Sequence, residues 1–460
     1  MTRAVAAALL GLVLVGAAAA ATIRGTARAD RIEAADGRRQ SIACGRSVDT
    51  VNADLVDRVA ADCEIVARRI ARDTTAIADA QHATIVEPDS AAFGSTVVTA
   101  FQVGRVRAGG AGTIGWASSR DSGRTWRSGV LPGVGHSSDP TVAFDAVHRV
   151  WLVVTLGITN GPTSVDVSRS PDGRTWSPAE SALSAPTAAF DKEWIFCDNW
   201  PSSPRRGTCY VAYTNLRTEA IGLTSSSDGG LTWAAPTAVG PPGDVVDGLP
   251  AALPGGTLVV AWLNGRTVFA ARSSDGGSSF GAPVAVTEIR AAATRGLRAP
   301  ELPALDVDRR GRLLLAWPDC RFRAGCSAND IALATSTDGT AWSTPTRVTS
   351  GSGSYSTPGL AADSRTNGIV VSAQVVPSGA CCSVGMAIAV SRDGSRWTPT
   401  RRLDVRAMPF DWLALAGNAR FLGDYLAASW AGGRPLAIVP IASPPRAGRL
   451  DQSLYAGTVR

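Results

Sequence analysis

Short apolar segments of strand type alternate with small polar turns along most of this chain. Examples are Thr113–Ala117 and Ile331–Ala334, each of which leads into a turn rich in Ser, Asp and Gly. Short apolar runs bounded by such residues are typical of β-strands joined by hairpins. We therefore expect residues 83–460 to form an all-β domain.

The segment 22–82 has a different pattern and is rich in Ala, Arg and Asp. Its valine and leucine residues follow a helical spacing loosely, at Val48, Val51, Leu55, Val59 and Val66. Apolar residues that recur every three or four positions predict an amphipathic helix. We expect residues 22–82 to form a short helical N-terminal extension or linker that packs on the β domain or precedes it as a spacer.

One turn sequence recurs six times: Ser, any residue, Asp, then Gly, then an aromatic residue four or five positions after the Asp. An Asp side chain accepts hydrogen bonds from nearby backbone amides, and Gly takes the positive φ that a tight turn needs. We interpret the six aspartates as structural, with the aromatic ring packed beneath each turn. They are Asp121, Asp172, Asp228, Asp275, Asp338 and Asp393.

The spacing of these turns predicts the architecture. Successive aspartates lie 47 to 63 residues apart, with a mean of about 54. Four short strands with their turns need about this length, which is one blade of a β-propeller. Residues 83–460 hold about seven such units, so we expect four-stranded blades and favour seven of them, with six as the alternative. The last unit, after Arg401, lacks the repeat.

The six copies resemble the Asp-box, or bacterial neuraminidase (BNR) repeat, of sialidase-superfamily propellers. The resemblance covers roughly residues 83–460 and implies the propeller fold. Similar boxes occur in sialidases, in some endoglucanases and in non-enzymatic receptor propellers. Two functions therefore stay open: a sialidase-like glycoside hydrolase that acts on glycans, and a non-catalytic extracellular propeller that binds a polar ligand or serves as a scaffold.

The N-terminus has the pattern of a secretory signal peptide. Arg3 precedes an apolar run from Ala4 to about Val15, and small residues follow through Ala21. We expect residues 1–21 to be this signal and the protein to be secreted. No other stretch is long enough to span a membrane.

Eight cysteines fit an oxidising compartment. Cys197 with Cys209, and Cys320 with Cys326, bracket turns and are expected disulfides. Cys44 is free to pair with Cys63. The adjacent Cys381 and Cys382 form either a vicinal disulfide or two separate bridges.

Composition excludes some partners. The 48 Gly and 27 Pro residues suit a turn-rich β-protein, and the net charge of +6 is small for 460 residues. A nucleic-acid partner is therefore not expected. Lys192 is the one lysine among 45 basic residues, which we attribute to a GC-rich genome. We expect a monomer that needs no cofactor.

The first positions of the repeats suggest where a site lies. In a propeller the inner strands converge on a central channel, and five of the seven repeats open with a carboxylate. In register, these acids would surround one mouth of the channel. Three interpretations remain: turn caps paired with arginines, a calcium site built from the oxygen ring, or a polar site for a glycan. The acids are Glu87, Asp139, Asp191 or Glu193, Glu301 and Asp424.

The resemblance to sialidases implies a further set of roles. That family uses three arginines around the sugar carboxylate, a Tyr–Glu nucleophile pair and an aspartic acid as proton donor. Tyr425 is the candidate nucleophile, or else a ring that fills the channel wall, with Glu301 or Glu193 as its base and Asp139 as a further candidate catalytic residue. The candidate substrate-binding residues are Arg298, Arg321, Arg323, Glu193 and Asp424.

The chain departs from the family at the first arginine. The family's Phe/Tyr-Arg-Ile-Pro motif does not occur ahead of the first box, where the sequence is Ile85-Val86-Glu87-Pro88-Asp89. The most similar sequence, Leu297-Arg298-Ala299-Pro300, lies far along the chain beside Glu301. Sequence therefore leaves open whether the protein is an enzyme.

Overall fold

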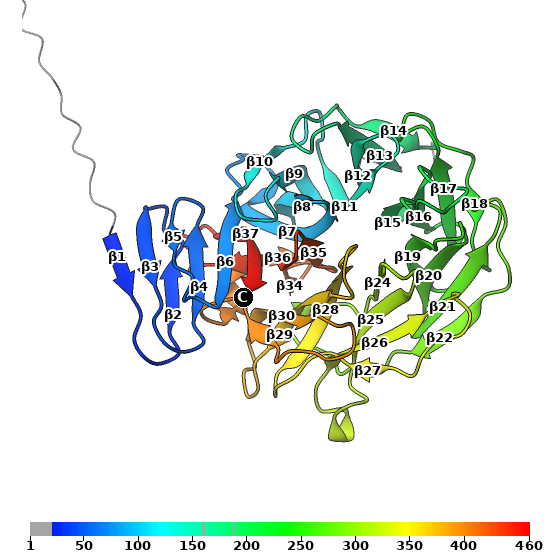
Figure 1. The fold of residues 1–460 in the computed structure, drawn as a ribbon. Helices are drawn as coiled ribbons and strands as arrows, with labels where there is room; N and C mark the ends of the chain where they lie inside the picture. Colours follow the sequence, from blue (N-terminus) through cyan, green and yellow to red (C-terminus); the bar gives the residue numbers. More distant parts are fainter. Residues whose placement is uncertain (1–20, 159–161, 186, 188) are drawn as a thin grey trace, which may run out of the picture.

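The computed structural model describes residues 21–158, 162–185, 187 and 189–460. The described chain is built from β-strands, with two short 3₁₀ turns at Ala324–Cys326 and Phe410–Trp412. The strands form a ring around a central axis, with a narrow arm on one side, which is the architecture of a β-propeller with an appendage (Figure 1). The all-β propeller prediction is confirmed. The expected signal peptide lies outside the described residues, except for Ala21, which begins the first strand.

Four sheets of the ring are built from consecutive antiparallel strands. The first two comprise β15 (Phe190–Cys197), β16 (Cys209–Asn215), β17 (Ala220–Ser226) and β18 (Thr237–Ala238), then β19 (Val245–Ala252), β20 (Leu258–Asn264), β21 (Thr267–Ser273) and β22 (Val284–Glu288). The next two comprise β24 (Ala304–Val307), β25 (Leu313–Asp319), β26 (Asp330–Ser336) and β27 (Thr346–Arg347), then β28 (Ser354–Ala362), β29 (Ile369–Val376), β30 (Ser383–Ser391) and β31 (Arg401–Arg402), with β32 (Met408–Pro409) also on β30.

A large sheet completes the ring. Two of its antiparallel groups are β7 (Ala80–Phe93), β8 (Thr96–Val106), β9 (Ala111–Ser119) and β10 (Arg127–Val130), and β11 (Ser137–Asp145), β12 (Val150–Ile158), β13 (Thr163–Ser170) and β14 (Glu180–Leu183). A third contains β35 (Ala427–Ala431), β36 (Arg434–Ala442), β37 (Gln452–Val459) and β6 (Ile65–Ala71). A small separate sheet contains β23 (Leu297–Arg298), β33 (Ala414–Ala416) and β34 (Ala419–Phe421).

Counted as hydrogen-bonded units, the described ring has five sheets, not the seven or six separate blades that the spacing predicts. The reason is that two single residue pairs, Ser137 with Ala111 and Gln452 with Thr84, join neighbouring groups of the large sheet. Repeat spacing counts antiparallel groups along the chain. It carries no information on whether adjacent groups share an edge.

The N-terminal extension is not helical, and that prediction is wrong. It is a solenoid of two parallel sheets: β1 (Ala21–Arg24), β3 (Gln40–Ala43) and β5 (Arg58–Val59) form one, while β2 (Arg31–Ala34) and β4 (Thr50–Asp54) pair with β6 in the other. Val51 and Val66 lie in the core between the sheets, whereas Val48 and Leu55 are exposed. The loose valine spacing therefore does not mark one face of a helix. A disulfide between Cys44 and Cys63 links successive coils.

The solenoid is continuous with the ring. Strand β6 pairs in parallel with β4 on one side and antiparallel with β37 on the other. The outer strand of the last antiparallel group thus comes from the N-terminal part of the chain, and its other strands come from the C-terminal part. Figure 1 shows β6 beside β37 where the arm meets the ring.

The recurrent turns have one hydrogen-bond pattern. At Asp338, the Oδ1 atom accepts N–H bonds from Thr340 at 2.8 Å and Ala341 at 3.0 Å, and Oδ2 accepts the Thr340 hydroxyl at 2.6 Å. The Ser336 hydroxyl accepts the N–H of Gly339, which has φ 78°. The Asp338 carboxylate thus accepts bonds from within its own turn, and the other five turns bond their aspartates in a similar way.

Candidate functional site

Five inner strands carry the same backbone irregularity. In each, the register with the next strand shifts, and a non-glycine residue at the shift has φ between 46 and 65°. A β-bulge of this kind re-aims a side chain. Four of the five residues are charged, and the bulges bring several of these charges together in the channel. The five are Glu87, Asp139, Lys192, Asp247 and Thr357.

The ammonium group of Lys192 lies among three carboxylates. Its Nζ atom is 3.5 Å from Glu87 Oε1, 3.2 Å from Asp139 Oδ1 and 3.1 Å from Asp424 Oδ2. The lysine side chain is 8% exposed. Burial acts to lower the pKa of Lys192, but the three carboxylates, Asp139 most strongly, outweigh burial and raise this pKa well above its ordinary value. We call these four residues the lysine cluster.

Glu87 is held from a second side. Gln102 Nε2 donates to Glu87 Oε2, and the Arg105 guanidinium lies 3.8 Å from the same oxygen. The backbone N–H of Asp424 donates to Glu87 Oε1 at 3.1 Å. Burial raises the pKa of Glu87 to about 7, although Lys192 acts in the opposite direction. This acid therefore exchanges its proton near neutral pH.

Asp424 is tied to an arginine as well as to the lysine. Arg298 Nε donates to Asp424 Oδ1 at 2.8 Å, and Arg298 Nη2 donates to the other oxygen. Burial acts to raise the pKa of Asp424, but Lys192 and Arg298 outweigh burial and lower it to about 2. Asp424 is thus an ionised anchor for both cations.

Acids outnumber bases around the lysine cluster. Glu193 is fully buried, and neither of its carboxyl oxygens has a hydrogen-bond partner among the described residues. Burial, reinforced by the charge of Asp139, raises the pKa of Glu193 well above its ordinary value. Burial also raises the pKa of Asp191 to about 6 and that of Asp247 to about 7. Glu193 is therefore protonated at neutral pH and Asp247 is partly protonated, which limits the excess negative charge.

A cavity of about 620 Å³ lies where the last residues of six inner strands converge. We call it the channel cavity. Its wall contains three tryptophans, the Asp308 carboxylate that pairs with Arg312, the side chains of Arg309 and Arg365, and small apolar residues from the strand ends, together with two further buried or half-buried carboxyl groups. The tryptophans are Trp194, Trp200 and Trp430, and the carboxyl groups belong to Asp89 and Asp306.

Asp89 and Asp306 each bond to the inner strand of another group. Asp89 Oδ2 accepts the N–H of Val142 at 2.7 Å, and Asp306 Oδ2 accepts the N–H of Ala362 at 2.7 Å. Burial raises the pKa of Asp89 to about 7, and the charge of Asp306 adds to this increase. Burial raises the pKa of Asp306 to about 6. Two carboxyl groups with separate pKa values near neutrality thus face one cavity.

Two aromatic rings connect the channel cavity with the lysine cluster. Trp194 lines the cavity, and its ring meets that of Tyr425 edge to face, with centroids 5.3 Å apart. Lys192 also lies against the Tyr425 ring, with Nζ 5.3 Å from the ring centroid. The Tyr425 hydroxyl donates to the carbonyl of Pro140 at 3.2 Å, and burial raises the pKa of Tyr425 well above its ordinary value. The tyrosine is thus a buried, protonated wall residue in this structure.

The structure brings together several of the residues that the sequence singled out, and separates others. Those that meet in the channel are Asp139, Glu193, Arg298, Asp424 and Tyr425.

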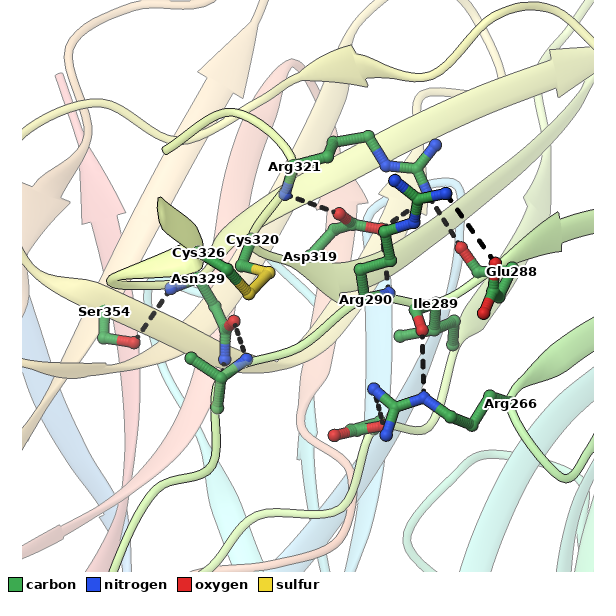
Figure 2. Close-up of a disulfide and its surroundings, with 12 residues drawn as sticks. Arg266, Glu288, Ile289, Arg290, Asp319, Cys320, Arg321, Cys326, Asn329 and Ser354 are labelled. Carbon is green, nitrogen blue, oxygen red and sulfur yellow. Dashed lines mark hydrogen bonds and ion pairs between the residues drawn. A yellow bond between two sulfur atoms is a disulfide. The ribbon is translucent and has the colours of Figure 1, made fainter. Parts of the chain in front are cut away.

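Glu301 lies elsewhere, in the segment before β24, where its side chain is 33% exposed and pairs with Arg266 at 3.6 Å. The inner strand begins only at Ala304, so Glu301 precedes the position that the other acids occupy. The three arginines bind three different carboxylates. Arg321 pairs with Asp319 beside the Cys320–Cys326 disulfide (Figure 2), and Arg323 pairs with Asp330.

Sequence reasoning did not identify Lys192, Asp89, Asp306 or Asp247. The signal for Lys192 was present, because it is the one lysine in the chain, but we assigned this bias to the genome. Asp89 stands two residues after Glu87, beyond the bulge, and lines the channel cavity. Asp306 carries no local sequence motif that would have marked it.

The four disulfides are Cys44–Cys63, Cys197–Cys209, Cys320–Cys326 and the vicinal Cys381–Cys382. Within the described residues, no group of three or more His, Cys, Asp or Glu side chains is arranged to hold a metal ion. Where a ring of oxygens was expected to bind a cation, the Lys192 ammonium lies among three of them. No helix in the described ranges is long and apolar enough to cross a membrane.

No family model and no curated protein matches this chain. The solved structures that are similar to this chain include sialidases, a polysaccharide lyase and a protein of unknown function. One is a protein of unknown function from Dyadobacter fermentans, at 17% identity over 70% of this chain and 98% of that one, with a TM-score of 0.48. Another is an ulvan lyase, a polysaccharide lyase, at 12% identity over 85% and 94%, with a TM-score of 0.49. A third is Trypanosoma rangeli sialidase, at 10% identity over 82% and 55%, with a TM-score of 0.45. The assignment as a propeller rests on the strand pairings above.

Proposed function

We propose that this protein is a sialidase-like propeller that binds a glycan in the channel cavity and hydrolyses a glycosidic bond there. The observation that carries the proposal is the composition of that cavity: three tryptophans and two protonatable carboxyl groups around about 620 Å³. Ligand sites are concave, largely apolar and supplied with a few convergent polar groups. Tryptophan offers an apolar face for the C–H surface of a sugar ring and an N–H for its hydroxyls.

The two carboxyl groups suit the two tasks of glycoside hydrolysis. Such enzymes pair a general acid with a carboxylate that activates water, and environments that separate two pKa values assign the roles. Asp89, with a pKa of about 7, is the acid, and Asp306, with a pKa of about 6, is the base. Asp89 protonates the glycosidic oxygen as its bond to the anomeric carbon breaks. Asp306 takes a proton from the water whose oxygen bonds to that carbon.

In this proposal the residues that the sequence singled out act from beneath the cavity. Tyr425 supports Trp194, and Asp139 and Asp424 fix Lys192 under the Tyr425 ring. Arg298 fixes Asp424 in turn. They are positioning residues for the tryptophan wall. Glu301, Arg321 and Arg323 have no part in it.

The test is hydrolysis of a fluorogenic panel of sialosides and neutral glycosides over a range of pH. The rate should be highest between about pH 6 and 7, where Asp306 is ionised and Asp89 is protonated. Asp89→Asn and Asp306→Asn should each lower kcat by about 10²-fold or more, as expected when a general acid or base is lost. Asp411→Asn, an exposed carboxylate in the Phe410–Trp412 turn, is the control. Equal turnover by all four proteins would refute these roles.

One observation favours a second function, a propeller that binds a glycan without cleaving it. Asp89 and Asp306 both accept backbone N–H groups of another inner strand, so their carboxyl groups also tie the ring together. For this function, binding without turnover is expected, with Trp200→Ala reducing affinity and Asp89→Asn leaving it unchanged. Isothermal titration with the same glycosides separates the two functions.

We further propose that the protein works outside the cell as a monomer and without a cofactor. Four disulfides support the location, because disulfides persist in oxidising compartments. Mass spectrometry of culture medium for a form that begins after the expected signal peptide, and light scattering of that form, test the location and the oligomeric state.

A further inference from the structure

A second cavity adjoins the channel cavity on the same face of the ring. We call this space of about 540 Å³ the side cavity. Phe93 and Phe144 line both cavities, so the two spaces share a wall. Phe93 ends β7 at the turn into β8, and it is 48% exposed. An exposed phenylalanine between two hollows is a surface on which a ligand can pass from one to the other.

Three aromatic rings follow one another in a row, each tilted against the next, from this shared wall into the side cavity. The centroids of Phe93 and Phe144 are 4.5 Å apart, and those of Phe144 and Trp151 are 4.6 Å apart. Trp151 is buried and fixes the row from below, while Phe93 forms its exposed end. The row therefore holds Phe93 in place, which reduces the conformational entropy that this side chain would lose on binding a ligand.

The side cavity also holds a guanidinium group with no partner. Arg120 and Asp172, both in its wall, pair with each other at 3.0 Å and leave little net charge. Arg149, also in its wall, is exposed and has no ion pair or side-chain hydrogen bond among the described residues. Arg149 has φ 55° in the turn between β11 and β12, so the backbone places it at the rim. A free arginine beside an aromatic row fits an anionic group on a sugar.

We propose that the ligand of this protein is an oligosaccharide with an anionic substituent, which runs from the channel cavity across Phe93 into the side cavity. The inference rests on the proposed function, because the channel cavity is its first subsite. One sugar occupies the channel cavity, a second stacks on Phe93, and the anionic group of a further unit pairs with Arg149. A carboxylate and a sulfate ester share this chemistry. The two cavities and Phe93 thus form a track that binds several successive sugars, and not a pocket for a single terminal sugar.

The test is isothermal titration with oligosaccharides of increasing length in three series. The probes are galacturonic acid oligomers, sulfated chondroitin oligomers, and neutral xylose oligomers. Affinity should rise at least tenfold from the dimer to the tetramer in an acidic series. Phe93→Ala should remove this rise and also weaken binding of the dimer, because the second sugar stacks on Phe93. Arg149→Ala should lower tetramer affinity about tenfold in that series alone, and the preference for carboxylate or sulfate identifies the substituent.

Matched substitutions outside the track control for general effects. Leu231→Ala removes another exposed apolar side chain of the ring, and Arg46→Ala removes an exposed arginine of the solenoid. Both should bind as the unchanged protein does. The track is refuted if affinity does not depend on oligosaccharide length, or if Phe93→Ala binds tetramers normally while Trp200→Ala does not. Binding in the channel cavity is then still supported. If Trp200→Ala has no effect on any probe, the proposed function fails and the track fails with it.

Discussion

Lys192 makes more ion pairs than any other side chain described above, three in all. It is the one lysine of the chain, and the three acids around it come from segments separated by up to several hundred residues. Removing one partner of a buried ion pair leaves uncompensated charge in a medium that solvates it poorly, which costs far more than losing a surface pair. The lysine thus binds three parts of the ring to one another.

Lys192→Met should destabilise the protein by about 3–5 kcal/mol at pH 7, the usual range for breaking a buried ion pair. The loss should be larger at pH 8 than at pH 5, because protonation of Glu87 and Asp191 at lower pH relieves the repulsion. Urea unfolding followed by tryptophan fluorescence measures both values.

Arg290→Met is the control for this change. The pair of Arg290 with Glu288 is exposed at both side chains, at 67% and 59%, so its loss should cost less than about 0.5 kcal/mol. Identical urea midpoints for Lys192→Met and the unchanged protein would mean that the lysine cluster does not hold the ring together.

Local sequence predicted those parts of the strands and turns whose bonds are local. The turn at Asp338 could be foreseen because every partner of its carboxylate lies within three residues. The solenoid could not, because its strands pair with residues 15 to 19 positions away, as Thr50 does with Ile65 and Arg31 with Thr50. Parallel pairing of this kind leaves no short-range signal.

The residues of the channel also divide into those that local sequence predicted and those that it did not. The sequence marked Glu87 and Asp139 because each precedes a proline at the start of a repeat, and the inner-strand bulges did bring them together. It misplaced Glu301, since the start of β24 could not be fixed to within three residues. It missed Asp306, because a shifted pKa results from burial by distant strands and not from neighbours in the chain.

Asp338→Ala should cost about 1–2 kcal/mol of stability at pH 7, since it leaves two N–H groups and two hydroxyls of the turn without their charged acceptor. Hydrogen bonds, that of the Thr340 hydroxyl foremost, lower the pKa of Asp338. A lowered pKa contributes stability that is present above the ordinary value of the unfolded chain and is lost as pH falls below it. The difference between variant and unchanged protein should therefore shrink between about pH 4 and pH 2.

Thermal unfolding at several pH values measures this difference. Asp411→Ala serves for comparison, because Asp411 lies in a short 3₁₀ turn outside the repeats. A difference that persists unchanged at pH 2 would contradict the assigned role of the carboxylate.

The ring as a closed body depends on a strand from the opposite end of the chain. Strand β6 supplies the outer edge of the group that contains β35, β36 and β37. The solenoid is therefore part of the closure and not an attached module. The change in composition suggested a boundary near residue 82. The parts of the chain on either side of it differ in sequence pattern but share one sheet.

A chain that begins at residue 80 should unfold at a markedly lower temperature than the chain from residue 21, because β37 keeps β36 but loses β6, its other antiparallel neighbour. A synthetic peptide of residues 61–79 with Cys63→Ser, added in excess, should raise the unfolding temperature of the short chain in a concentration-dependent way. A scrambled peptide is the control. Equal unfolding temperatures for the two chains would show that β6 does not contribute to closure.

Closure by β6 also sets an order of events during synthesis. Residues 65–71 are synthesised early, but their partner β37 (Gln452–Val459) emerges only after every other described strand of the ring. For that interval β6 is an unprotected edge, the kind of edge that recruits other chains. Its sequence answers this hazard with two adjacent arginines: Arg69 is already paired with Asp54, and Arg68 with carbonyls of Asp54 and Asp57. The preceding coil thus holds the two arginine charges that protect this edge. Strand β6 stays free to pair until β37 has been synthesised.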